Sequence, residues 1–131
     1  MCTRFLTAAL FLALPFAFSL GASTGRAGED ALAEVNAARA ARGLKPFIRD
    51  DGLTAGAINV ADVRARALCA GHSANDFAGL PVGCHASAAG CAAWQPELGW
   101  GACCTFENWT YAGAAYSIGR DGKRYMQLFI R

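Results

Sequence analysis

The chain of 131 residues lacks a marked excess of charge, with 12 lysines and arginines against 10 aspartates and glutamates. Two of the basic residues, Arg4 and Arg26, precede residue 28, so residues 28–131 carry 10 basic and 10 acidic side chains. Beyond residue 27 the chain also lacks internal repeats, low-complexity tracts, a G-x-S-x-G serine and a phosphate-binding glycine loop. This balance argues against nucleic acid or an anionic membrane surface as a partner.

A long apolar run occurs at the start of the chain. Residues 5–20 are almost entirely apolar, follow a short positive segment and are followed by small residues. This is the pattern of a secretory signal peptide, and the run is short for a membrane span. We predict cleavage after Ala27, with cleavage after Ser23 or an uncleaved anchor as alternatives. The expected product is a single domain, residues 28–131, that is secreted to the extracellular space, periplasm or cell surface without a transmembrane anchor.

Cysteine is frequent for so small a domain. Those that follow residue 27 are Cys69, Cys84, Cys91, Cys103 and Cys104. A small secreted domain buries limited apolar surface, so these residues predict disulfide bonds. Five cysteines allow at most two bridges and leave one free or intermolecular thiol, with the pairing open. The spacing of Cys84-His85, Cys91 and Cys103-Cys104 does not match common structural zinc sites, so we expect no metal and no cofactor.

Two helices are predicted in residues 30–70. The first has an apolar stripe with charged residues outside it: Leu32, Val35 and Ala38 against Glu34, Arg39 and Arg42. Gly43 is expected as its left-handed cap residue. Asp50 and Asp51 are placed to accept hydrogen bonds from the amides that open a second helix, expected from near Gly52 to Cys69 and ended by Gly71.

The rest of the chain divides into a loop-like segment and a hairpin. Residues 71–101 are rich in glycine, alanine and proline and predict a long loop. Residues 108–118 and 123–131 predict two strands joined by a turn that contains Asp121-Gly122. Apolar residues alternate onto both faces of the second strand, which predicts a sheet covered on both sides.

Several of these segments share residues with a known secreted family. The helix and turn carry V-N-x-x-R, G-L-x-P-F and D-x-x-L-T, formed by Val35, Asn36, Arg39, Gly43, Leu44, Pro46, Phe47, Asp50, Leu53 and Thr54. The strands carry W-T-Y-A-G-A-A and Y-M-Q-L-F. Together they resemble the CAP superfamily of cysteine-rich secretory and pathogenesis-related domains. The resemblance implies an α+β fold, a three-layer α-β-α sandwich with a C-terminal antiparallel β-hairpin.

The family's usual cleft holds two histidines and two acids, and this sequence matches that set poorly. Gly71-His72-Ser73 matches the first histidine position, whereas Asn108 occupies the second and no G-E-N segment supplies the first acid. The candidate cleft residues are His72, Asn75, Asp76, Glu107 and Asn108. His72 beside Asp76 is typical of a base or metal ligand, and the alternative is that Asn75 and Asp76 only satisfy turn amides.

The incomplete set favours a non-enzymatic extracellular module that binds a protein or a small ligand such as a lipid, sterol or glycan. Trp94, Trp100, Phe106, Trp109 and Tyr111 form an aromatic band that either lines such a groove or packs the core. The alternatives are a hydrolase or metal-assisted enzyme that uses His72 with Asp76, and a purely structural cell-surface module. An enzyme requires His72 to reach a carboxylate in an open pocket that faces Glu107 or Asn108.

Overall fold

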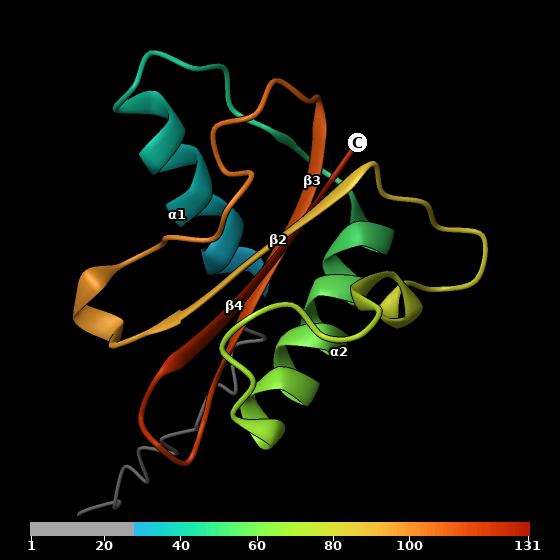
Figure 1. Ribbon diagram of the computed structural model, residues 1–131. Coiled ribbons are helices and arrows are strands. Elements are labelled where there is room, and N and C mark those ends of the chain that lie inside the picture. Colours follow the sequence, from blue (N-terminus) through green and yellow to red (C-terminus); the bar gives the residue numbers. More distant parts are fainter. Residues whose placement is uncertain (1–27) are drawn as a thin grey trace, which may run out of the picture.

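A computed structural model describes residues 28–131 (Figure 1). The predicted signal peptide, residues 1–27, lies outside the described residues. The described chain is a mixed α+β fold with two α-helices, two short 3-10 turns and a four-stranded sheet. Its elements are α1 (Gly28–Ala40), β1 (Ile48–Arg49), α2 (Asp51–Ala67), η1 (Asp76–Gly79), β2 (Ala88–Trp94), η2 (Pro96–Leu98), β3 (Tyr111–Ile118) and β4 (Arg124–Ile130). Within residues 28–131, neither helix has the length and apolar character that crossing a membrane requires.

The sheet has the order β1-β3-β4-β2. β3 and β4 form the predicted antiparallel hairpin, with Ala112 opposite Ile130, and the turn closes by a 2.9 Å hydrogen bond from the Gly122 amide to the Gly119 carbonyl. β2 is antiparallel to β4 over seven residue pairs, and the two-residue β1 runs parallel to β3. The central position of β4 makes it the most thoroughly buried strand.

One helix covers each face of the sheet, as Figure 1 shows. Leu32 and Val35 of α1 belong to the buried cluster that contains Leu128, whereas Leu53 of α2 belongs to the cluster that contains Phe129. Leu128 and Phe129 are neighbours in β4 and therefore point to opposite faces. The expectation of a sheet covered on both sides is confirmed.

The predicted caps of Gly43 and Asp50 are present, whereas the end of the second helix differs from the prediction. Gly43 has the predicted left-handed conformation, with φ at 70°, and Asp50 caps α2 by accepting the Leu53 amide at 2.9 Å. However, α2 ends at Ala67, and the left-handed residue after it is Leu68, with φ at 52°, rather than Gly71. The side chain of Leu68 is tolerated there because the amides of residues 68 and 69 still bond to carbonyls of the last helical turn.

Arg39 was expected outside the apolar stripe of the first helix, and this prediction is wrong. Arg39 is only 2% exposed. Its guanidinium donates to the carbonyls of Lys45, Thr105 and Glu107 at 2.7–2.8 Å and lies 3.7 Å from the Phe47 ring centroid. A guanidinium can be buried when its donors are satisfied, and charge alone is therefore a poor guide to its position.

The segment predicted as a long loop contains a strand, β2. Its sequence, AAGCAAW, offers little β propensity, and it is ordered by pairing with β4 along its whole length. Gly90 allows the segment 101–105 to cross β2 closely, because a Cβ at this position would lie 1.8 Å from the carbonyl oxygen of Cys103. This crossing brings Cys103 beside Cys91.

Candidate functional site

His72 lies in the turn that follows α2, and a buried arginine holds this turn. Arg64 is 1% exposed and donates from Nε to the Gly71 carbonyl at 2.9 Å and from Nη2 to the Ala70 carbonyl at 2.6 Å. Its Nη1 donates to the Met126 carbonyl in β4 at 2.5 Å. The turn is thereby fixed against the sheet immediately before His72.

The His72 ring is oriented by the carboxylate of Asp76. His72 Nδ1 lies 2.6 Å from Asp76 Oδ2, while the histidine side chain is 50% exposed and the aspartate side chain only 3%. Ser73 donates its amide to Asp76 Oδ1 at 2.8 Å and its hydroxyl to the same oxygen, and Gln127 Nε2 donates to Oδ2 at 3.3 Å. The predicted pairing of His72 with Asp76 is thus present in the structure.

Two opposing effects set the charge of Asp76. Burial is the largest and would raise the pKa of this carboxyl, but hydrogen bonds from His72, Ser73 and Gln127 together hold the pKa below its ordinary value. Asp76 is therefore ionised at neutral pH and accepts the Nδ1 proton of His72. In the imidazole tautomer that donates from Nδ1, the lone pair is on Nε2, on the opposite side of the ring.

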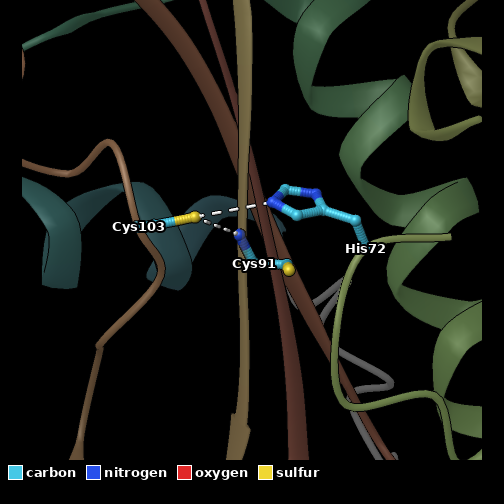
Figure 2. Close-up of side chains that lie close together, drawn as sticks. All are labelled: His72, Cys91 and Cys103. Atoms are coloured by element: carbon cyan, nitrogen blue, oxygen red, sulfur yellow. Dashed lines mark hydrogen bonds between the residues drawn. The ribbon is translucent and has the colours of Figure 1, made fainter.

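Two cysteine thiols lie near the free ring nitrogen of His72 (Figure 2). His72 Nε2 is 3.7 Å from Cys103 Sγ, and the backbone amide of Cys91 donates to the same sulfur at 3.3 Å. One ligand atom from each of His72, Cys91 and Cys103 lies within 4.8 Å of the other two. The three residues come from the turn after α2, from the middle of β2 and from the segment that crosses β2.

The five cysteines of the described chain are all free thiols in this structure. The sulfur of Cys104 lies 3.6 Å from the Ala89 carbonyl oxygen. Burial, followed by a hydrogen bond to Glu107, raises the pKa of its thiol to about 12. Burial also raises the pKa of Cys91. Cys69 contacts the carbonyls of residues 71 and 72, and Cys84 packs on the α2 side of the sheet. The expectation of up to two disulfide bonds stays a prediction.

The structure brings together three of the five candidate cleft residues. His72, Asn75 and Asp76 line an open cavity of about 230 Å³ together with Ser73, Ala74, Phe77 and Ala89. Glu107 and Asn108 do not line this cavity; the Glu107 carboxylate instead accepts the indole N–H of Trp109 at 2.9 Å. The cleft therefore lacks the opposing polar residues that the family resemblance implies.

The aromatic band is divided between core and surface. Trp94 and Trp100 pack against the α1 cluster, and their indole N–H groups are satisfied by Gly99 and Thr105. Phe106, Trp109 and Tyr111 are 40–41% exposed, and arginine side chains stack on Phe106 and Tyr111. Two of the five residues thus pack against the core, and three lie at the surface, where Phe106 and Tyr111 contact cationic side chains.

The grouping of His72 with Cys91 and Cys103 was not found from the sequence, because no two of these residues share a local motif. The only sequence signals were the resemblance at His72 and the glycine at position 90. Comparison with protein-family models, with curated proteins and with solved structures found no match.

Proposed function

We propose that the chain is a secreted CAP-like domain, built as a three-layer α-β-α sandwich, that binds an extracellular ligand at the His72 cleft. The layered packing of α1 and α2 on opposite faces of the sheet supports the scaffold assignment. The motif residues of the resemblance also have scaffold roles. The side chain of Asn36 exchanges two hydrogen bonds with the Phe47 backbone, at 2.8 and 3.1 Å, and the hydroxyl of Thr54 donates to the Asp50 carbonyl.

The main support for a binding function is that the buried Asp76 carboxylate fixes a half-exposed His72 beside an open cavity. A histidine that only fills a turn does not require a buried, ionised partner, because keeping that carboxylate away from water is costly unless hydrogen bonds compensate. The arrangement instead preorganises Nε2 for an external group, and preorganisation lowers the cost of binding.

A ligand screen by thermal shift tests this proposal on the purified full chain with its thiols reduced. The probes are divalent metals, oligosaccharides, fatty acids and a sterol. We expect at least one class to raise the melting temperature of the wild type, as mass action requires, and to have no effect on the His72→Ala variant. His85→Ala is the matched control, because the other histidine lies at a different cavity. Equal shifts in the wild type and His72→Ala, or none with any probe, would contradict the proposal and favour a structural module.

A second candidate is a thiol hydrolase in which Cys103 is the nucleophile, His72 the base and Asp76 the orienting acid. The 3.7 Å and 2.6 Å contacts of His72 favour it. Two features count against it. Cys103 does not line the cavity, and the nearby Cys91 amide donates to the sulfur itself, so it is not free to stabilise an oxyanion.

Hydrolysis of activated esters and of a mixed peptide library separates the two candidates. The binding proposal predicts equal rates for the wild type and Cys103→Ser. A loss of about 100-fold or more in Cys103→Ser would support the hydrolase, since a thiol nucleophile acts as a unit with its base.

A further inference from the structure

We propose that His72 Nε2, Cys91 Sγ and Cys103 Sγ bind one Zn²⁺ ion, with Asp76 as the outer carboxylate and a fourth position open to solvent or a ligand. The inference rests on the proposed function, because it names a ligand for Nε2 of the same histidine; Cys91 and Cys103 lie beside His72 and do not line its cavity. It also replaces the sequence-based expectation of no metal, which considered only the spacing along the chain.

The distances between the ligand atoms fit a tetrahedral ion. With Zn–S near 2.3 Å and Zn–N near 2.05 Å, tetrahedral angles place nitrogen and sulfur about 3.6 Å apart and two sulfurs about 3.8 Å apart. His72 Nε2 and Cys103 Sγ are separated by 3.7 Å, and all three ligand atoms lie within 4.8 Å of one another. Binding therefore requires only small movements of the Cys91 and Cys103 side chains (Figure 2).

The contact on the other side of the imidazole supports the same assignment. A metal-bound histidine usually donates its second ring N–H to a carboxylate or carbonyl, which sets the tautomer and the ring orientation. His72 makes this contact to Asp76 at 2.6 Å, and Gln127 and Ser73 hold the carboxylate in turn. The nitrogen that remains free is the one that faces Cys103.

Each of the three ligands is held independently of the ion. Arg64 holds the turn before His72, and the β2–β4 ladder holds Cys91. The Cys103 amide donates to the Cys91 carbonyl at 3.4 Å, and Arg39 binds two carbonyls of the following residues. Because the three ligand residues are already ordered, binding of the ion costs little conformational entropy, and this favours tight binding.

The donor types decide which ion the site takes. Thiolates and imidazole favour Zn²⁺ and disfavour Mg²⁺ and Ca²⁺, which take oxygen ligands. Cys103 and His72 are both exposed at the surface, so solvent reaches the ion from one side. Three protein ligands with an open fourth position are the arrangement of zinc sites that bind an exchangeable group.

Calorimetric titration of the reduced, chelator-treated full chain with Zn²⁺ tests the inference. We expect one ion per chain, and affinity lowered about 100-fold or more in Cys91→Ser, Cys103→Ser and His72→Ala, each of which removes a ligand. Asp76→Asn is expected to lose about 10- to 100-fold, as an outer-sphere partner does. Cys104→Ser is the matched control, because its sulfur is next to Cys103 in the chain but points to Ala89; its affinity should be unchanged.

Two measurements on the wild type test the zinc site even if a substitution prevents folding. Zn²⁺ should slow the alkylation of Cys91 and Cys103 in the wild type, read by mass spectrometry, and leave Cys84 unaffected. Co²⁺ in place of Zn²⁺ should show thiolate charge-transfer absorption. Absence of Zn²⁺ binding, binding that survives both cysteine substitutions, or a Cys91–Cys103 disulfide in the protein as first isolated would overturn the site. If Zn²⁺ does not bind, but another probe raises the melting temperature only of proteins that keep His72, the zinc site is refuted and the proposed binding function is still supported.

Discussion

At the scale of single residues, the two buried arginines do most to position the site. Arg39 extends from α1 and Arg64 from α2, and each donates two hydrogen bonds to backbone carbonyls of a segment that carries a site residue. Neither arginine forms a side-chain ion pair in the described part of the chain. Their charge is stabilised by carbonyl dipoles, and these loops would otherwise leave carbonyls unsatisfied.

Replacing Arg64 by lysine tests this role. Lysine keeps the charge but cannot reach several carbonyls in a fixed fork, so buried acceptors lose their partners. We expect Arg64→Lys to lower the free energy of unfolding by about 2–4 kcal/mol, measured by urea denaturation. Arg66→Lys, two residues away on the exposed face, is the matched control and should change it by less than about 0.5 kcal/mol. Similar losses in both variants would refute the assigned role.

The cap residue Asp50 makes the stability of the protein depend on pH. The Leu53 amide, and then Arg131, hold the pKa of Asp50 below its ordinary value despite partial burial. A depressed folded-state pKa gives stability that is complete above the unfolded-state pKa, near 4, and is lost as the pH falls through the folded-state value.

Two substitutions at Asp50 separate the cap from the charge. Asp50→Ala should cost about 1 kcal/mol at pH 7 through loss of the cap, measured by urea denaturation. Asp50→Asn should keep the cap and show a weaker loss of stability between about pH 4 and pH 2 than the wild type. An unchanged acid profile in Asp50→Asn would contradict the assignment.

At the scale of elements, local signals predicted some segments and failed for others. The hairpin β3–β4 and both helices follow from turn chemistry, capping and apolar period, which are properties of neighbouring residues. β2 was missed because its alanines and glycine carry no strand signal, and its order comes from pairing with β4. The burial of Arg39 was missed because two of its three carbonyl partners lie 66 and 68 residues further along the chain.

The contact between α2 and β3 gives a prediction at this scale. Gly113 lies under the first turn of α2, and a Cβ there would be 2.0 Å from the backbone nitrogen of Thr54. Backbone atoms cannot move aside as a flexible side chain does, so Gly113→Ala should cost about 3 kcal/mol or more, measured by thermal or urea unfolding. Gly71→Ala, where a Cβ would meet nothing within 4 Å, should be within about 1 kcal/mol of the wild type. A stable Gly113→Ala protein would show that the helix is packed less closely than described.

At the scale of the whole molecule, the scaffold was more predictable than the site. The fold class, the two helices and the hairpin are visible in the sequence, whereas the site joins residues 72, 91 and 103 from three segments. Spacing rules for zinc describe ligands in pairs on one short loop and do not apply to such a set. Glu107 and Asn108 were taken from the family resemblance, and in the structure neither residue lines the His72 cavity.

Cleavage of the predicted signal peptide can be tested by expression. Expression in a secreting host should yield a protein whose N-terminus is Gly28, because cleavage after Ala27 places small residues at both recognition positions. Intact-mass measurement of the secreted protein checks this. An N-terminus at Thr24 would select the alternative cleavage site, and an intact Met1 in the membrane fraction would refute cleavage.

The crossing of β2 by the segment 101–105 has a consequence for solubility. β2 is an edge strand of the sheet, and the outward-facing amide and carbonyl of Cys91 both form hydrogen bonds with Cys103. An uncovered strand edge is a template on which a second chain can add. The residue that faces His72 therefore also covers the sheet edge at Cys91. Loosening this segment should promote self-association. We expect Cys103→Gly to scatter light under conditions in which the wild type stays dispersed.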